Sequence, residues 1–374
     1  MKRVVKSIYA PTRYVFVADR FSNFISVTDI VSGEHVETLN FSMRPHVMEL
    51  ARDDAMLAVG SPEVSAIEFM NLRTRERRRV ELPSPVFQIF FVPQTNLVAV
   101  GLRDQVGMIS YKDFTVRIFP RRFDSDQRQT LINTYYSLLF SSFSQSFWVL
   151  DEDRPCIYHR YGGAEPLDAP WKTIDLSRHI GSGSGLGIGV ASPEDDLLAM
   201  TTDDGSEGLV YFPAQDKVLS TGPMRTVGST NEPMIMPYID AYSKHVIFAD
   251  VTGNVAMFDL VNGNGKPERF RVNFSPRFVR TGWLESTWIL AGDKGIMFQS
   301  FKDPSDRKVV RFVPEVMNMW VTGDSKTALY TLDEGAPAIY RFDIRTREQL
   351  PPIRVRGVTM ASMLRMGSNN SICY

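Results

Sequence analysis

The chain has 374 residues with 42 basic and 43 acidic side chains, so its net charge of −1 provides no overall field to attract nucleic acid or an anionic membrane. No uncharged apolar run approaches the length of a transmembrane helix, and Lys6 and Arg13 interrupt the N-terminal segment before it could form a secretory signal. The sequence therefore predicts a soluble, cytoplasmic protein with no nucleic-acid partner and no direct membrane insertion.

Short β-rich runs, bounded by Gly, Pro, Asp or Asn, recur along the whole chain. The opening unit extends from Val4 to Phe41, and residues 46–82 and 86–119 each contain four such runs in the same order. The pattern recurs in five further segments: Leu138 to Leu150, Ile188 to Met200, Met234 to Phe248, Phe278 to Leu290, and Met317 to Tyr330. These segments make eight units.

A four-stranded sheet with one apolar face cannot cover that face alone, so neighbouring units must pack face to face and close into a ring. The sequence predicts an all-β fold, a β-propeller of four-stranded antiparallel blades, with eight blades favoured and seven as the alternative. We expect residues 357–365 to add an innermost strand that pairs near Tyr14 to Asp19 or near Val4 to Tyr9. Residues 1–366 would form a single domain, followed by a flexible tail at 367–374.

The first unit carries the clearest family resemblance. Tyr14 to Asp19 (YVFVAD), Asn23 to Ile30 (NFISVTDI) and Ser32 to Val36 (SGEHV) resemble the YVTN-type repeat, and Gly253 to Leu260 is a weaker copy. The resemblance implies a WD-repeat-like propeller of the quinoprotein amine dehydrogenase-like kind. Relatives of this kind include dehydrogenase subunits, lactonases and interaction platforms, so the resemblance implies a fold and no single activity.

An acidic residue follows the second strand of every unit, in a loop that propellers place at one face. The set comprises Asp19, Glu63, Asp104, Asp151, Glu152, Asp153, Asp203, Asp204, Asp250, Asp293, Asp333 and Glu334. Such a ring of carboxylates could hold a cation or a basic partner. The alternative is turn chemistry, because Asp side chains accept hydrogen bonds from their own loop backbone.

Basic residues occupy the connections between units on the same face. Together with four of the carboxylates they define a predicted partner-binding rim: Arg44, His46, Arg121, Arg122, Arg178, His179, Arg225, Arg277, Asp104, Asp153, Asp204 and Asp293. Alternating charges would suit a charged protein partner or a carboxylate ligand. Ordinary solvated loops also carry arginine, so the rim has a purely structural alternative.

Three further segments depart from the repeat. Residues 120–136 form the longest connection and predict a short helix from Gln127 to Tyr135. The glycine run from Gly181 to Gly189 lacks the strand and helix context of a nucleotide-binding loop, and its glycines would let an innermost strand fit the crowded channel. The basic cluster from Arg73 to Arg79 is expected on a turn and an outermost strand, where charge protects a sheet edge.

The sequence contains no recognisable catalytic, metal-binding or cofactor-binding signature. Its five histidines have no paired ligand spacing, its two cysteines have no CxxC partner, and both GxSxG and CxxCH are absent. We therefore expect no catalytic residues, no metal and no cofactor. The favoured function is a non-catalytic scaffold that binds other protein subunits of a complex. The alternative is a quinoprotein amine dehydrogenase-like subunit or a lactonase-type hydrolase acting at the channel mouth.

Overall fold

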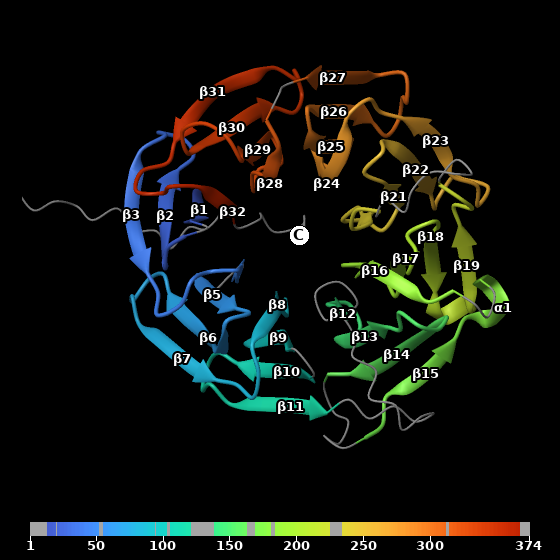
Figure 1. Ribbon diagram of the computed structural model, residues 1–374, viewed down its shortest axis with the longest axis horizontal. Helices are drawn as coiled ribbons and strands as arrows, with labels where there is room; N and C mark the ends of the chain where they lie inside the picture. Colours follow the sequence, from blue (N-terminus) through green and yellow to red (C-terminus); the bar gives the residue numbers. More distant parts are fainter. Residues whose placement is uncertain are drawn as a thin grey trace, which may run out of the picture. The chain divides into compact units, whose positions relative to one another are not determined.

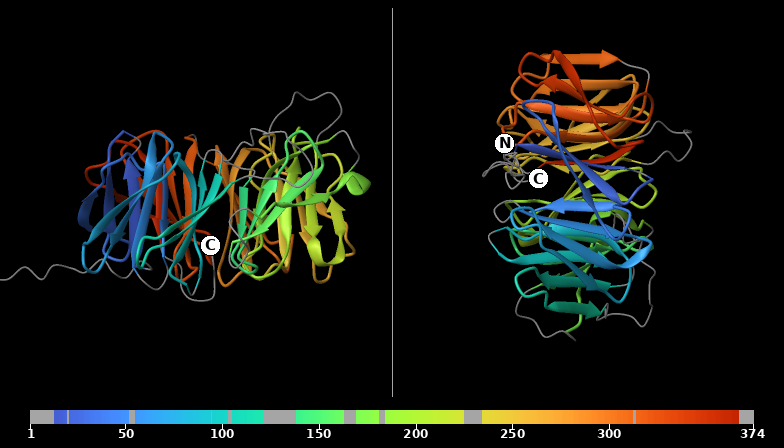
Figure 2. Two further views of the ribbon diagram at one scale, coloured as in Figure 1. Left: turned by 90° about the horizontal axis from the view of Figure 1, so that it is seen from below. Right: turned by 90° about the vertical axis from the view of Figure 1, so that its left-hand side faces the viewer.

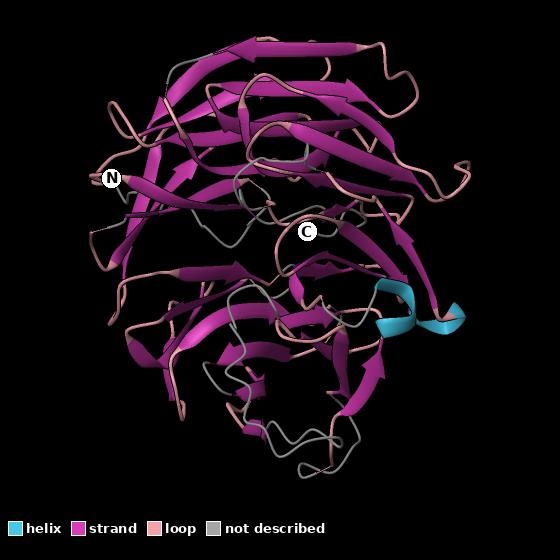
Figure 3. Ribbon diagram, turned by 45° about the vertical axis from the view of Figure 1, so that its right-hand side comes forward, coloured by secondary structure: helices cyan, strands magenta, loops and turns pink. Residues whose placement is uncertain are grey.

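The computed structural model describes residues 13–19, 21–51, 55–93, 95–102, 105–120, 138–162, 169–180, 184–224, 234–311 and 314–366. These residues form eight four-stranded sheets, and the colouring of Figure 3 shows how little helix accompanies them. The protein is thus an all-β, eight-bladed propeller of four-stranded antiparallel sheets, as predicted, and the seven-bladed alternative is wrong.

The first blade combines strands from both ends of the chain. Its order is β3-β2-β1-β32, with β1 at Tyr14–Asp19, β2 at Phe24–Asp29, β3 at His35–Asn40 and β32 at Ala361–Met366. Strand β32 runs antiparallel to β1, and the blue and red strands can be followed side by side in Figures 1 and 2. The expected pairing of the C-terminal segment with Tyr14–Asp19 is therefore confirmed, although the strand begins at Ala361 and not at Gly357.

The other seven blades each use four consecutive strands (Figure 1). Their bounds are β4 (Val47–Leu50), β5 (Met56–Ser61), β6 (Val64–Asn71), β7 (Arg77–Glu81); β8 (Val86–Phe91), β9 (Leu97–Leu102), β10 (Gln105–Ser110), β11 (Val116–Pro120); β12 (Leu138–Ser141), β13 (Ser146–Leu150), β14 (Cys156–Tyr161), β15 (Lys172–Asp175); β16 (Leu186–Ala191), β17 (Leu198–Thr202), β18 (Gly208–Phe212), β19 (Lys217–Ser220); β20 (Tyr238–Ile239), β21 (His245–Ala249), β22 (Asn254–Asp259), β23 (Glu268–Arg271); β24 (Ser275–Gly282), β25 (Thr287–Asp293), β26 (Gly295–Ser300), β27 (Arg307–Arg311); and β28 (Val316–Val321), β29 (Thr327–Leu332), β30 (Ala338–Asp343), β31 (Gln349–Arg354). The first strand of each blade, or β32 in the first blade, is the inner strand, which in a propeller lies nearest the central channel.

Internal contacts divide the chain into two compact units, each with its own packing. The first comprises Met1–Val100, Ser110–Phe114 and Arg280–Tyr374, and the second comprises Gly101–Ile109 and Thr115–Val279. The boundaries predicted for a single domain and a tail stay a prediction, and residues 367–374 lie outside the described residues.

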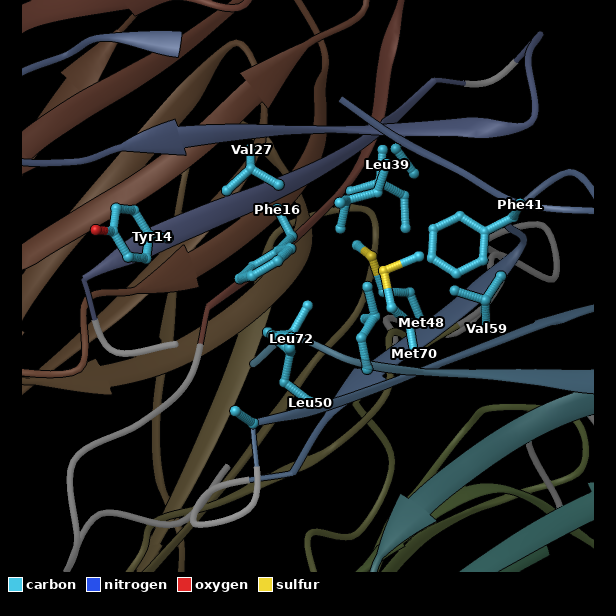
Figure 4. Packing of buried hydrophobic residues seen from close by; sticks show 14 of the residues in the cluster. Tyr14, Phe16, Val27, Leu39, Phe41, Met48, Leu50, Val59, Met70 and Leu72 are labelled. Carbon is cyan, nitrogen blue, oxygen red and sulfur yellow. The ribbon is translucent and has the colours of Figure 1, made fainter. Parts of the chain in front are cut away.

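The core of the first unit lies between the faces of adjacent blades. Phe16 and Leu39 of the first blade pack with Met48, Met70 and Leu72 of the second, as Figure 4 shows. All five are almost completely buried. Burial of a side chain of this size contributes roughly 1.5–3 kcal/mol, so blade stacking, which neither blade could achieve alone, stabilises both.

In the second unit, the glycine run makes room for the neighbouring strand and not for the central channel. The inner strand β16 begins at Leu186, inside the run, and includes Gly187 and Gly189. A Cβ at Gly187 would collide with the carbonyl oxygen of Thr202, and one at Gly189 with that of Ala199. Both oxygens belong to β17 of the same sheet, so the glycines permit close strand pairing.

Helical structure is confined to two short segments of the described chain. The α-helix α1 (Ser177–Ile180) connects β15 to β16, and a 3-10 helix occupies Pro213–Gln215. The helix predicted from Gln127 to Tyr135 lies outside the described residues.

Candidate functional site

Two of the predicted rim residues meet a carboxylate from a neighbouring loop. Arg44 and His46 lie on the connection from β3 to β4, and Glu63 lies on the turn from β5 to β6. Arg44 forms an ion pair with Glu63, and His46 Nε2 lies 4.0 Å from Glu63 Oε1. Burial and the charge of Arg44 lower the pKa of His46 despite the carboxylate.

Arg178 and His179 pair with a carboxylate that does not follow the second strand of a blade, where the predicted acidic residues lie. Both lie on α1, and both pair with Asp216, which follows the 3-10 helix between the third and fourth strands of its blade. His179 Nε2 is 3.6 Å from Asp216 Oδ1. An aspartate outside the predicted acidic set therefore provides their counter-charge.

Three described acidic residues of the set, Asp151, Asp204 and Asp250, accept hydrogen bonds from groups of their own loops. Asp204 accepts from the Thr202 hydroxyl at 2.6 Å and from the backbone N–H of Ser206. Asp250 accepts from four groups of Thr252 and Asn254, and Asp151 accepts from the backbone N–H of Asp153 and from the hydroxyl of Tyr158. These bonds favour turn chemistry at these positions.

Two further predicted rim residues lie on strands of one blade, and four others lie outside the described residues. Arg277 lies on β24 and Asp293 ends β25, and both have interaction partners. Asp104, Arg121, Arg122 and Arg225 lie outside the described residues. A functional role of the complete rim stays a prediction.

The basic cluster from Arg73 to Arg79 lies where it was expected, on the turn before β7 and on β7 itself. Arg75 pairs with Glu37 of the first blade at 2.8 Å, and Arg79 pairs with Glu81 at 2.6 Å. Arg77 and Arg78 lie over aromatic rings of the adjacent blades. The basic residues from Arg73 to Arg79 thus cover the exposed outer strand β7 and connect it to the two adjacent blades.

The inner strands of the first unit carry a group of charged and aromatic residues that the sequence analysis missed. We call it the inner-strand cluster: Glu49 on β4, Arg280 on β24, Trp320 on β28 and Arg365 on β32. The carbon atom at the centre of the Arg365 guanidinium lies 4.7 Å from the centroid of the Trp320 ring, and that of Arg280 lies 5.2 Å from it. Two cations therefore share one indole, an arrangement favoured by the negative face of the ring.

The cluster holds only one carboxylate against its two guanidinium groups. Glu49 Oε2 lies 3.4 Å from Arg365 Nε, with the two side chains 24% and 21% exposed. Burial raises the pKa of Glu49, and the charges of Arg365 and Arg280 and the N–H of Leu50 oppose this without cancelling it. The four residues of the cluster thus place two guanidinium groups and one carboxyl group at partly buried positions.

Strand packing explains why these side chains are held in place. The indole N–H of Trp320 donates a hydrogen bond of 3.0 Å to the carbonyl oxygen of Met366, and the ring packs in the apolar cluster that includes Leu364. The signal in the sequence was a charged residue inside an apolar inner strand, as in VMEL for Glu49 and ASMLRM for Arg365. Each charge alone is unremarkable, and only their convergence defines a site.

Within the described part of the chain, no group of three or more His, Cys, Asp or Glu residues could hold a metal ion. No helix of that part is long and apolar enough to cross a membrane. Cys156 lies on β14, and burial raises the pKa of its thiol, so thiolate chemistry is disfavoured there.

The described strands define a class by fold, the eight-bladed propeller of four-stranded antiparallel sheets. Comparison with known proteins supports this class through the fold alone. No protein-family model matches the chain, and no curated protein matches it.

Three solved structures share the architecture at low sequence identity. One is described as dihydro-heme d1 dehydrogenase NirN in complex with DHE, with a TM-score of 0.68 and 14% identity over 92% of this chain and 74% of that chain. Another is a functionally unknown protein from Desulfotomaculum acetoxidans DSM 771, with a TM-score of 0.55 and 8% identity over 96% of this chain and 100% of that one. The computationally designed Ika8 protein gives a TM-score of 0.55 and 12% identity, covering 82% of this chain and 85% of that chain.

Proposed function

We propose that this protein is a binding propeller that takes an anionic, carboxylate-bearing ligand at the inner-strand cluster. The observation that carries the proposal is the pair of guanidinium groups over the Trp320 ring, with Glu49 as the carboxylate of the cluster. We further propose a YVTN-type repeat family for the chain and the cytoplasm as its location, as the sequence predicts.

Arginine is suited to carboxylate binding because its planar guanidinium group can donate two parallel hydrogen bonds to the two carboxylate oxygens. The buried Trp320 ring holds both guanidinium groups in place beside the site. A tetrapyrrole with carboxylate side chains is one ligand of this chemistry, and the similar protein NirN is described in complex with DHE. Hemin and benzene-1,3,5-tricarboxylate are therefore suitable first probes, one large and one small.

Binding can be measured by isothermal titration calorimetry of the full chain with each probe. We expect Arg365→Met and Arg280→Met each to weaken binding by about ten- to a hundredfold, because each removes a charge-assisted hydrogen bond. Arg354→Met is the matched control, since Arg354 is exposed on the outer strand β31 of the same unit. Equal binding of the trimethyl ester of the tricarboxylate, or unchanged affinity in both cluster variants, would refute the proposal.

A second candidate is the scaffold function predicted from the sequence, in which a protein partner docks on the rim of the first unit. Phe21 favours it, because this side chain is 62% exposed on the turn from β1 to β2. The ion-paired Arg44 and Glu63 lie on other loops of this unit, and exposed aromatic and arginine side chains are enriched at interfaces. Co-purification from the native host with wild type and with Phe21→Ser tests it: a partner retained equally by both would contradict this docking surface.

The enzymatic alternative requires a histidine and an acid that together face the channel. Of the two histidines of the predicted rim, His46 lies near Glu63 and His179 near Asp216. Neither pairing favours a dehydrogenase subunit or a lactonase over a binding protein, so that alternative stays a prediction without a supporting observation.

A further inference from the structure

Glu49 occupies the position that an incoming anion would need. Its carboxylate and the guanidinium of Arg365 come from two inner strands, β4 and β32, that pack against each other. The same guanidinium also lies over the Trp320 ring. A ligand carboxylate that takes Arg365 must therefore compete with a carboxylate of the protein itself.

We propose that Glu49 is an internal competitor, which pairs with Arg365 in the free protein and is displaced with uptake of one proton when a ligand carboxylate binds. The inference rests on the proposed anion site. In the exchange, the ionised ligand replaces the ionised Glu49 at Arg365, and a proton from solvent neutralises Glu49. The sum of charges at the cluster then stays the same before and after binding.

The surroundings of Glu49 favour this exchange. Its cross-strand neighbour on β5 is Ala58, and neither β5 nor β8 (sequence VFQIFF) brings a titratable side chain. On β32 the one titratable group is Arg365, and from β24 the charge of Arg280 acts on Glu49. No second carboxylate of these strands could take the proton in its place.

Burial of the Glu49 carboxyl group favours its protonation during this exchange. It raises the pKa of Glu49, and the strongest opposing influence is the charge of Arg365. Once a ligand carboxylate neutralises that charge, less remains to stabilise ionised Glu49, so the pKa of the Glu49 carboxyl rises further and a proton is taken up. By linkage, the affinity for an anion falls as pH rises, by at most about tenfold per pH unit for a single proton.

Calorimetry with benzene-1,3,5-tricarboxylate between about pH 6.5 and 8.5 tests this inference, since ordinary carboxyl pKa values near 4 leave the probe ionised throughout. Two cationic buffers of different ionisation enthalpy report the number of protons taken up without competing for the site. We expect wild type to take up a proton and to bind more weakly as pH rises. Glu49→Gln should bind without proton uptake, with constant affinity, and more tightly than wild type at the highest pH.

The outcomes separate the two proposals. If Glu49→Gln takes up the same proton as wild type, the competitor role of Glu49 is wrong while the anion site stands. If wild type binds no probe at any pH, the anion site is wrong and this inference with it. Glu49→Met serves as a second variant should the glutamine variant fail to fold.

Stability provides an independent readout of the same residue. Because the pKa of Glu49 is raised in the folded protein, its ionisation destabilises the fold as pH rises through that value. Glu49→Gln should therefore gain thermal stability over wild type at high pH and lose that advantage at low pH. A constant difference across the pH range would contradict the raised pKa on which the competition depends.

Discussion

His159 offers a test of the structure in which the magnitude can be worked out in advance. The residue lies on β14, between Trp148 on β13 and Lys172 on β15, which are its direct cross-strand partners. The imidazole is 8% exposed, and its ring centroid lies 3.9 Å from that of Trp148. Burial, aided by the charge of Lys172, lowers the pKa of His159 to about 4.

The sign of the effect follows from proton linkage. An unfolded histidine with an ordinary pKa of about 6.5 binds a proton at moderately acidic pH, whereas folded His159 does not until about pH 4. Its contribution to stability is therefore fully present above pH 6.5 and is lost as pH falls through this window. At about pH 4.5 the loss amounts to about 2.5 kcal/mol, from about 1.4 kcal/mol per pKa unit.

The assay compares urea unfolding of wild type and His159→Phe at about pH 7 and pH 4.5. Phenylalanine keeps an aromatic ring against Trp148 but cannot titrate, so the variant should lose about 2.5 kcal/mol less than wild type between the two pH values. Carboxylates that titrate in the same range affect both proteins equally and cancel in the comparison. Parallel losses in the two proteins, or a His159 ring that titrates near pH 6.5 by NMR, would refute the reasoning.

Three further predictions follow from single contacts. Trp320→Phe removes the hydrogen bond to Met366 and leaves a buried carbonyl without it, so it should cost about 1–3 kcal/mol; an unchanged unfolding midpoint would contradict this. Gly208→Ala places a Cβ in steric conflict with ring atoms of Phe248 and should cost about 1–3 kcal/mol in chemical unfolding. Adding Phe248→Leu should recover part of that loss, and strictly additive losses would argue against the clash. In a Cys373→Ser background, the raised pKa of Cys156 should make its reaction with a disulfide reagent at about pH 8 slower than that of free cysteine, and urea should abolish the difference.

The strand pattern allowed much of the fold to be predicted. Short runs such as Tyr14–Asp19 and Val64–Asn71 are rich in β-branched and aromatic residues and end at turn residues, which is information local to each run. The pairing of β32 with β1 could also be expected, because an incomplete first blade needs a further strand. The reason for the glycine run could not be predicted from sequence, because the carbonyl groups that exclude a Cβ belong to the partner strand.

The rim could be predicted only in part. Arg44, His46 and Glu63 were placed on neighbouring loops from sequence, and they do meet. Arg178 and His179 instead meet Asp216, because α1 directs them toward the outer strands of the next blade. A short helix between two strands changes where a side chain points, and no repeat pattern encodes that change.

By itself the sequence determined the kind of blade and favoured eight of them over seven, because alternating apolar strands can satisfy their faces only by stacking on similar sheets. Tertiary structure alone decided the inner-strand cluster. Glu49, Arg280, Trp320 and Arg365 lie on four different strands, far apart along the chain, and come together only when their blades pack. The burial that raises the pKa of Glu49 exists only in the assembled fold, and it is this burial that turns four scattered residues into a candidate site.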